Sequence, residues 1–273
     1  MANADDIKLA AEWIEGADAL LIGAGAGMGV DSGLPDFRGN KGFWKAYPIA
    51  KQQGKSFSQM ANPRLFKQNP RLAWGFYGHR LNLYKKTEPH AGFQVLKTWC
   101  DSKPLGGFVY TSNVDGHFQK AGFSDQQVYE CHGSIHYLQC ADGCCNHLWA
   151  VDEEIIEIDE QRLELISRLP LCEACGAVAR PNILMFGDIH WEAHRSSEQE
   201  SLWYDWLQST KRKDLVVIEI GAGIAVPTVR NACSRLGKKL IRINPEHTKV
   251  EGRGISFSMG GLEAIVRIRD ALR

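Results

Sequence analysis

"GAGAGMGVDSGLPDFRG", residues Gly23 to Gly39, follows a short apolar run and places glycines at four alternating positions from Gly23 to Gly29. Glycines spaced in this way let main-chain amide groups approach a diphosphate without interference from Cβ atoms. The spacing departs from the Gly-x-Gly-x-x-Gly pattern of many dinucleotide-binding loops, because Met28 or Val30 would stand at the third glycine. The stretch predicts a nucleotide-binding turn, and a purely structural tight turn is the alternative.

Apolar segments around this loop predict an α/β fold. An amphipathic helix is expected over Ala4–Ile14, and a strand over Ala19–Ile22 leads into the glycine loop. Further buried parallel strands are expected at Gly106–Asp115, Gln127–Gly133, Asn182–Asp188, Asp214–Gly223 and Lys238–Glu246. Further helices are expected at Pro89–Cys100, Trp191–Thr210, Pro227–Leu236 and Gly261–Leu272. Strands that alternate with helices predict a doubly wound, Rossmann-like parallel sheet with right-handed crossovers.

Two stretches interrupt the alternation. Residues 43–86 are rich in aromatic residues and helix-like segments, and residues 135–180 contain two cysteine clusters around an acidic, helix-like segment at 152–169. We therefore expect three units in the chain. These are a Rossmann-like domain with the nucleotide-binding turn (1–45, 87–134 and 181–273), a helical insertion with the cofactor-binding loop (46–86) and a small zinc-binding module (135–180).

The cysteines of the second stretch predict a structural zinc site. Cys140 forms a close pair with either Cys144 or Cys145, and Cys172 and Cys175 form the other pair. Thiolate pairs at this spacing are typical of a closed tetrahedral zinc site, which has no open position for catalysis. The spacing to the following tryptophan favours Cys144 over Cys145 as a ligand. We expect the metal to hold the module together.

Composition limits the partners and the location. The 273 residues contain 32 basic and 32 acidic side chains, so the net charge is +0, and the pI is about 7.1. Such a balance offers no electrostatic argument for a nucleic-acid or membrane partner. Neither a membrane-spanning stretch nor a basic signal region is identified, so the cytosol is the expected location. In that compartment eight cysteines are expected to bind metal or to be buried as thiols.

Three polar residues follow predicted strands. His132 ends one buried strand, and Asn113 and Asp115 follow another. From the pattern alone, His132 is either a general base or a core or capping histidine, and the other two fit ordinary turn chemistry equally well.

Taken together, the motifs resemble the sirtuin (Sir2) family of NAD-dependent protein deacylases from one end of the chain to the other. In chain order, the matching segments are the glycine loop, Thr111–Gly122, Cys131–Ser134, the two cysteine pairs, Arg180–Asp188, Ile220–Pro227 and Ile243–Glu246. Their order and spacing match the family, which no single motif could establish.

The resemblance implies an NAD site built from several segments. Gly25, Ala26 and Gly27 would hold the diphosphate and ribose. Asp36, Phe37 and Arg38 would lie beside the nicotinamide ribose, where the phenyl ring would shield the cation-like sugar carbon from water. The other implied cofactor-binding residues are Ser112, Asn113, Asp115, Gly221, Gly223, Asn244 and Glu246.

The resemblance also implies roles in catalysis. His132 would be the general base and would accept a proton relayed from the ribose hydroxyls after the acyl oxygen attacks the anomeric carbon. Asn113 and Asp115 would hold the carboxamide and the ribose hydroxyls. The segment implied to pair with an extended substrate peptide consists of Phe186, Gly187 and Asp188. The implied products are nicotinamide, the free lysine and an acylated ADP-ribose.

Several residues depart from the family pattern. Gly29 replaces the usual serine, Ser112 the usual glutamine, and Phe118 a common histidine. Each lost polar partner removes about 1 kcal/mol of hydrogen bonding, so a modified mode of NAD binding is expected. No clear Tyr-x-x-Arg pair of the kind that selects acidic acyl groups is identified after the Asp-Phe-Arg segment, which favours a neutral acyl group, acetyl by default.

These features predict an enzyme whose partners are NAD and an acyl-lysine protein or peptide. The replaced loop residues also fit an ADP-ribosyltransferase or NAD glycohydrolase, and a non-catalytic NAD or ADP-ribose sensor is the third interpretation. A nicotinamide dehydrogenase is disfavoured, because the expected glycine spacing and a hydride-transfer site are both lacking. The oligomeric state is left open.

Overall fold

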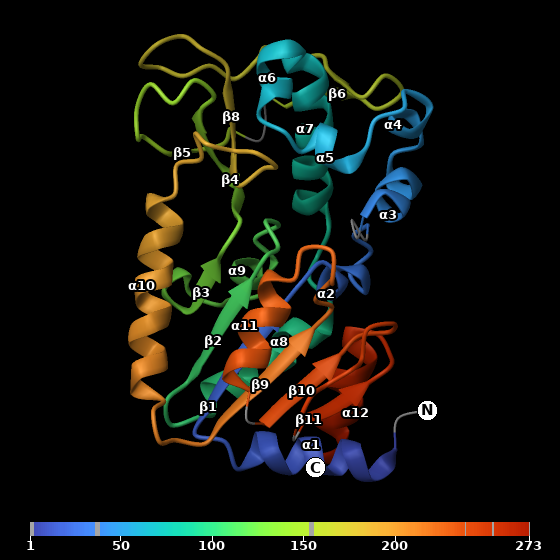
Figure 1. The fold of residues 1–273 in the computed structure, drawn as a ribbon, viewed down its shortest axis with the longest axis vertical. Coiled ribbons are helices and arrows are strands. Elements are labelled where there is room, and N and C mark those ends of the chain that lie inside the picture. The colour runs from blue at the N-terminus through green and yellow to red at the C-terminus, as the bar shows by residue number, and fades with distance from the viewer. Residues whose placement is uncertain (1–2, 36–38, 153–155, 238, 253, 273) are drawn as a thin grey trace.

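The computed structural model places a parallel sheet in one half of the molecule and the two inserted segments in the other (Figure 1). It describes residues 3–35, 39–152, 156–237, 239–252 and 254–272. The helices are α1 (Ala4–Glu15), α2 (Gly27–Val30), α3 (Gly39–Ala46), α4 (Pro48–Gln52), α5 (Phe57–Met60), α6 (Arg64–Gln68), α7 (Pro70–Lys86), α8 (Ala91–Asp101), α9 (His117–Lys120), α10 (His194–Ser209), α11 (Thr228–Leu236) and α12 (Gly261–Ala271). The strands are β1 (Ala19–Ala24), β2 (Gly107–Thr111), β3 (Val128–Glu130), β4 (Gly133–Cys140), β5 (Trp149–Ala150), β6 (Ile158–Asp159), β7 (Glu164–Leu165), β8 (Ala179–Ile183), β9 (Leu215–Ile220), β10 (Lys239–Ile243) and β11 (Gly254–Phe257).

The main sheet has six strands in the order β3-β2-β1-β9-β10-β11. Every neighbouring pair in it is parallel. This is the strand order of the doubly wound dinucleotide-binding fold, in which the chain starts at the centre and builds outward in both directions. The predicted fold class is therefore confirmed.

Apolar clusters cover both faces of the sheet. Successive side chains of a strand point to opposite faces, so β1 contributes to both clusters. Leu20 and Ile22 of β1 pack with α8 and α12 in one apolar cluster, which contains Phe93 and Ile265. Leu21 lies in another cluster with residues of α11. All six residues of β1 are buried, which explains its uninterrupted apolar sequence.

A further apolar core lies away from the sheet. It joins the helical insertion to the cysteine-containing segment, and Trp74 and Phe76 of α7 are completely buried in it. The indole Nε1 of Trp74 donates a hydrogen bond of 2.8 Å to the carbonyl oxygen of Ala179 in β8. The helical character predicted for residues 43–86 matches α3 to α7, whereas the boundaries of the three predicted units stay predictions.

Two predicted elements are wrong. A parallel strand was expected over Asn182–Asp188, but the observed strand β8 ends at Ile183. Strand β8 also pairs antiparallel with β4, outside the main sheet. The acidic segment at 152–169 was expected to be helical, but its described part forms the antiparallel pair β6 and β7. Leu163 has a φ of 55° in the turn between them, which breaks a helix. Strand β11 was not predicted.

Tertiary packing explains the hairpin. A Cβ atom on Gly75 of α7 would lie 1.9 Å from the carbonyl oxygen of Leu163, so the turn rests directly on the helix backbone. A Cβ atom on Gly78, one turn later, would lie 2.6 Å from Ile156 Cγ2. These long-range contacts outweigh the local helical pattern.

Among the described residues, no helix combines the length and the apolar character that crossing a membrane requires.

Candidate functional site

The loop after β1 packs directly against the loop after β9. A Cβ atom on Gly25 would lie 2.7 Å from Ala222 Cα, and one on Gly27 would lie 2.6 Å from Gly221 Cα. The Gly25 amide donates to the Ile220 carbonyl oxygen at 3.0 Å, and the Gly27 amide to that of Gly221 at 3.1 Å. The glycines are thus required for contact between two protein loops, a role that the sequence analysis did not foresee.

These loops lie where the strand order reverses, between β1 and β9. Doubly wound sheets bind ligands in the crevice at the carboxyl ends of the strands at this point. A hollow of about 80 Å³ lies here. Its lining residues are Gly27, Val30, Asp31, Gly221, Ile243, Pro245, Met259, Gly260 and Gly261. Two predicted cofactor-binding residues, Gly27 and Gly221, therefore share one recess.

The end of β2 is tied to the glycine loop by side chains. Asn113 Nδ2 donates to the Gly25 carbonyl oxygen at 3.1 Å. Thr111 Oγ1 donates to the Ala24 carbonyl oxygen at 2.9 Å and accepts from the Asn113 amide at 3.0 Å. The Ser112 amide also donates to Ala24, at 3.2 Å. The structure thus brings Ser112 and Asn113 to the glycine loop. Thr111, which organises them, was not singled out, because a strand-end threonine carries no distinctive signal.

Asn244 organises the next loop along the sheet. Its side chain is fully buried, and Nδ2 donates to the Ala222 carbonyl oxygen at 2.9 Å. Its Oδ1 accepts from the amides of Glu246 and His247 at 3.1 and 3.0 Å. Glu246 itself is exposed and Gly223 half-buried. The predicted adenosine-side residues therefore gather at the carboxyl ends of β9 and β10.

His132 lies at the junction between the main sheet and β4. Its carbonyl oxygen accepts from the Leu184 amide at 2.9 Å, and its Nε2 lies 3.4 Å from Thr228 Oγ1. Gly133 follows with a φ of 78°, and a Cβ atom there would lie 2.1 Å from the Asn182 carbonyl oxygen. Burial lowers the pKa of His132 below its ordinary value of 6.5. The imidazole is therefore neutral at pH 7, the form that accepts a proton.

Asp115 lies on the wall of a larger cavity behind the Asn113 loop. Its Oδ1 accepts from the His117 amide at 3.0 Å, and the residue is 9% exposed. The cavity measures about 400 Å³. Its lining residues are Tyr84, Lys85, Asp115, Gly116, Gln119, Lys120, Asp125, Glu130, Ser134, His136, Tyr137 and Arg195. The glycine loops do not contribute to this lining, so the structure does not place Asp115 in the recess that Gly27 and Gly221 line.

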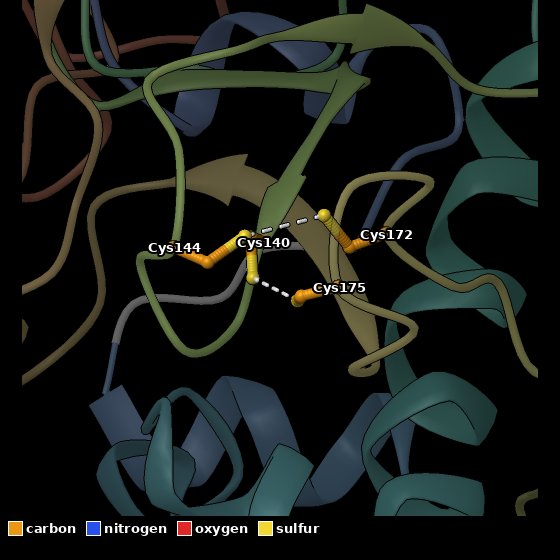
Figure 2. A group of neighbouring side chains, drawn as sticks. All are labelled: Cys140, Cys144, Cys172 and Cys175. Carbon is orange, nitrogen blue, oxygen red and sulfur yellow. Dashed lines mark hydrogen bonds between the residues drawn. The ribbon is translucent and has the colours of Figure 1, made fainter.

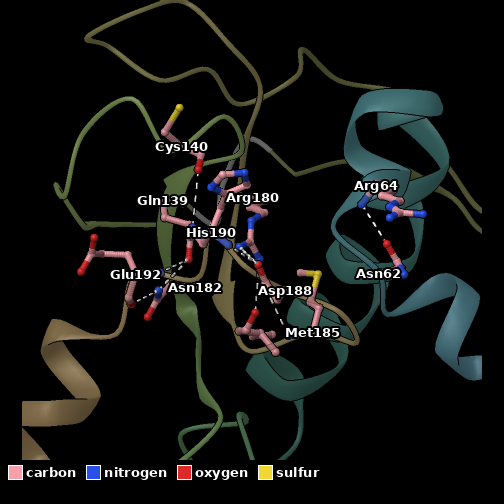
Figure 3. A network of polar contacts seen from close by, with 11 residues as sticks. Asn62, Arg64, Gln139, Cys140, Arg180, Asn182, Met185, Asp188, His190 and Glu192 are labelled. Carbon is pink, nitrogen blue, oxygen red and sulfur yellow. Dashed lines mark hydrogen bonds and ion pairs between the residues drawn. The ribbon is translucent and has the colours of Figure 1, made fainter.

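The predicted substrate segment is anchored from within. Figure 3 shows the Asp188 carboxylate meeting Arg180, whose Nη2 donates to Oδ1 at 2.8 Å. Both side chains are completely buried. The amides of Met185 and His190 also donate to this carboxylate, each at 3.3 Å. The Asp188 side chain is thus occupied inside the protein, and a contact with a peptide at this residue would use the main chain.

Phe186 belongs to the same segment and is 42% exposed. Its amide donates to the Ala61 carbonyl oxygen at 2.9 Å, and its ring lies edge-on to Phe57 with centroids 5.9 Å apart. Gly187 has a φ of 68°, which a residue with a side chain adopts only at a cost. The segment therefore contacts the helical insertion. The predicted residues Asp36, Phe37 and Arg38 lie outside the described residues.

Helix α7 contains a Tyr-x-x-Arg pair. The expectation that no such pair follows the Asp-Phe-Arg segment is therefore wrong. The pair is Tyr77 and Arg80, and both residues are buried. Arg80 donates to the Tyr84 hydroxyl through Nε at 3.1 Å and Nη2 at 2.8 Å. Among the described residues, the Tyr77 hydroxyl has no hydrogen-bond partner. The pair was not recognised in the sequence because it lies far along the chain from the glycine loop.

The four predicted cysteine ligands converge (Figure 2). The sulfur atoms of Cys140, Cys144, Cys172 and Cys175 all lie within 4.8 Å of one another. The Cys140–Cys175 and Cys144–Cys172 sulfur pairs are 3.7 and 3.6 Å apart. A tetrahedron with zinc–sulfur bonds of about 2.3 Å has edges of about 3.8 Å, so the arrangement fits a structural zinc ion. Cys145 lies 3.9 Å from Cys172 but is not a member of the cluster.

Comparison with known proteins identifies the family. The model of the "Sir2 family" matches residues 25–225 of the chain. The chain belongs to the Sir2 family. This sirtuin is 30% identical over 232 residues to an NAD-dependent protein deacylase of Aquifex aeolicus, and the match covers 83% of each chain. The resemblance to NAD-dependent protein deacylases that the motifs predict is therefore confirmed.

Two other proteins are similar to this sirtuin. One is a probable bifunctional ADP-ribose hydrolase/ADP-ribosyltransferase of Fusarium oxysporum, 29% identical over 234 residues, which cover 82% of the sirtuin and 38% of that relative. The other is the crystal structure of a Sir2 homolog–NAD complex, with a TM-score of 0.66 and 23% identity. That match covers 97% of this sirtuin and 95% of the other chain, and it supports the fold.

Proposed function

We propose that this sirtuin removes acyl groups from lysine side chains of proteins in a reaction that consumes NAD. NAD-dependent protein deacylation follows from membership of the family and from the Aquifex aeolicus relative. The observation that carries the finer proposal is the contact of the buried His132 imidazole with Thr228, the residue that follows the loop after β9. Gly27 and Gly221 would hold the adenosine and diphosphate part, and Asn113 would fix the nicotinamide side.

The proposed mechanism assigns proton transfer to His132. NAD, when bound, supplies an electrophilic ribose carbon and nicotinamide as the leaving group. The acyl oxygen of the lysine attacks that carbon, and Nε2 of His132 accepts the proton released from a ribose hydroxyl. A ribose hydroxyl then attacks the acyl carbon, one water molecule enters and the lysine amine leaves, so that the acyl group ends on ADP-ribose. The four thiolates would hold zinc in a closed site and would take no part in the reaction.

Two residues of α7 bear on the acyl group that the sirtuin would remove. Acetyl is the default expectation from the sequence, but Tyr77 and Arg80 favour an acyl chain that ends in a carboxylate. Such a carboxylate would accept hydrogen bonds from the guanidinium and from the Tyr77 hydroxyl, which otherwise remains buried without a partner in the described structure. We therefore propose a comparison of acetyl-lysine and succinyl-lysine as substrates.

The decisive experiment measures nicotinamide release from NAD with no peptide, with an acetyl-lysine peptide and with a succinyl-lysine peptide. The native chain is compared with His132→Ala and with His194→Ala, an exposed histidine on α10. We expect release to require one of the peptides and to fall about 10²–10⁴-fold in His132→Ala, because a general base contributes about that much. His194→Ala should behave like the native chain.

A second candidate function is NAD cleavage with transfer of the ribose to water or to a protein side chain. The Fusarium oxysporum relative and the glycine at position 29 favour it. Nicotinamide release at the full rate without peptide would support this function and contradict the deacylase. Labelled ADP-ribose on protein would then distinguish transfer from hydrolysis.

A further inference from the structure

The hydroxyl of Thr228 lies beside the imidazole of His132. The two residues are 96 positions apart, and Oγ1 is 3.4 Å from Nε2. Thr228 is the first residue of α11, a nine-residue helix that covers the face of the sheet next to β9. The contact therefore joins the start of this helix to the junction between β3 and β4.

The surroundings of His132 favour the neutral ring. Burial lowers its pKa, and in the part of the chain that the structure describes no charged side chain adds to that shift. The neighbouring Cys131 is uncharged near pH 7, because burial raises the pKa of its thiol to about 12. The start of α11 also disfavours a nearby positive charge, because the free amide groups of a helix N-terminus carry partial positive charge.

A neutral imidazole has one nitrogen that donates and one that accepts a hydrogen bond. The hydroxyl at Nε2 can serve as the donor, which leaves the ring proton on Nδ1. Hydrogen bonding to the neutral form stabilises that form further. The Leu184 amide holds the main chain of His132, and the threonine hydroxyl contacts the ring itself, so it can act on the orientation of the ring.

We propose that Thr228 is a positioning residue for His132: its hydroxyl donates to Nε2, holds the ring proton on Nδ1 and directs the Nε2 lone pair toward the crevice. This inference rests on the proposed role of His132 as the general base. During the reaction the substrate hydroxyl takes the place of the threonine hydroxyl at Nε2. The proton then moves from that hydroxyl oxygen to Nε2, which gives an imidazolium protonated on both nitrogens.

The test compares Thr228→Val, which removes the hydroxyl but keeps the branched shape, with Thr228→Ser, which keeps the hydroxyl. The imidazole signals of the free protein are followed by ¹⁵N and ¹H NMR from pH 5 to 9 and assigned with His132→Ala. We expect the native protein and Thr228→Ser to show the Nδ1-protonated tautomer. Thr228→Val should show a mixture of tautomers and a higher imidazole pKa. Thr210→Val, which removes a hydroxyl bonded to Leu207 at the end of α10, should leave the His132 signals unchanged.

Steady-state kinetics give the second readout. Loss of the hydrogen bond shifts the tautomer ratio about fivefold toward the ring protonated on Nε2, which cannot accept a proton there. We therefore expect kcat of Thr228→Val to fall by up to about fivefold, with KM for NAD and peptide nearly unchanged and recovery in Thr228→Ser. Identical tautomer and pKa in Thr228→Val and the native protein would overturn the proposal. The NMR measurement needs no turnover. Shifted His132 signals in a protein that lacks deacylase activity would therefore support the positioning role and reject the proposed function.

Discussion

Gly25, Gly27 and Gly221 bring the ends of β1 and β9 into backbone contact. A Cβ atom added to any of these glycines would lie 2.4–2.7 Å from its nearest neighbour, which is shorter than real Cβ contacts. The neighbouring atoms belong to the main chain. Main-chain atoms cannot move aside as the end of a flexible side chain can. The crevice at the centre of the sheet therefore depends on these residues even before a ligand binds.

The substitution Gly25→Ala tests this dependence. The new Cβ would lie 2.7 Å from both Ala222 Cα and the Gly221 carbonyl oxygen, so one loop must shift. We expect the free energy of unfolding to fall by about 1–3 kcal/mol, as for other overpacked sites, and NAD binding to weaken. Urea denaturation and NAD titration measure the two effects.

Gly16→Ala at the end of α1 is the matched control, because its Cβ would make an ordinary contact of 3.4 Å with the Glu12 carbonyl oxygen. Equal stability of the two variants would contradict the role assigned to Gly25.

At the scale of elements, the cysteine-containing segment has little regular structure of its own. Strand β5 has two residues and pairs with β4 through two residues, and the loop from 141 to 148 connects them. The four cysteines come from this loop, from the end of β4 and from the turn before β8. A metal ion that joins them supplies stability that such short elements lack.

The adjacent residues Cys144 and Cys145 allow a sharp test of the ligand set. Cys144→Ser should lower the bound zinc well below one ion per chain, because a serine hydroxyl is a poor ligand. Cys145→Ser should keep one ion per chain, because its sulfur is not part of the cluster. Metal analysis after dialysis measures both. Zinc loss in Cys145→Ser with retention in Cys144→Ser would show that the ligand assignment is wrong.

At the scale of the whole molecule, separate apolar cores stabilise the sheet and the insertions. One contains Leu20, Ile22 and Ile218 of the sheet, and the other contains Trp74 and Phe76 of α7. The second core also includes residues of the cysteine-containing segment, namely Ala141 and residues of the described hairpin. Loss of the metal should therefore destabilise α7 before it destabilises the sheet.

Removal of zinc by a chelator tests this arrangement by hydrogen exchange. We expect amide protection to fall in β4, β8 and α7, because they share the core next to the cysteines. Protection in β1 and β9, which lie at the centre of the sheet, should change little. Uniform loss of protection across both cores would instead indicate one cooperative unit.

The sequence was most informative where the signals are local. The glycine loop, the cysteine pairs and the alternation of apolar strands with helices each depend on residues close together in the chain. They predicted the doubly wound sheet, the family and the four-cysteine cluster. The same local signals failed for residues 152–169, where α7 packs against the chain at Gly75 and Gly78 and stabilises a hairpin.

The sequence by itself determined the fold class, the family and the residues available for chemistry, because spacing and residue type are properties of the chain. Only the tertiary structure decided how those residues are used. It turned Asp188 inward to Arg180, paired β8 antiparallel with β4, and set the hydroxyl of Thr228 beside His132. Each of these outcomes depends on a partner that is distant in the chain or on the direction of a side chain. Folding selects such contacts through packing and burial of polar groups, and neither leaves a local pattern in the sequence.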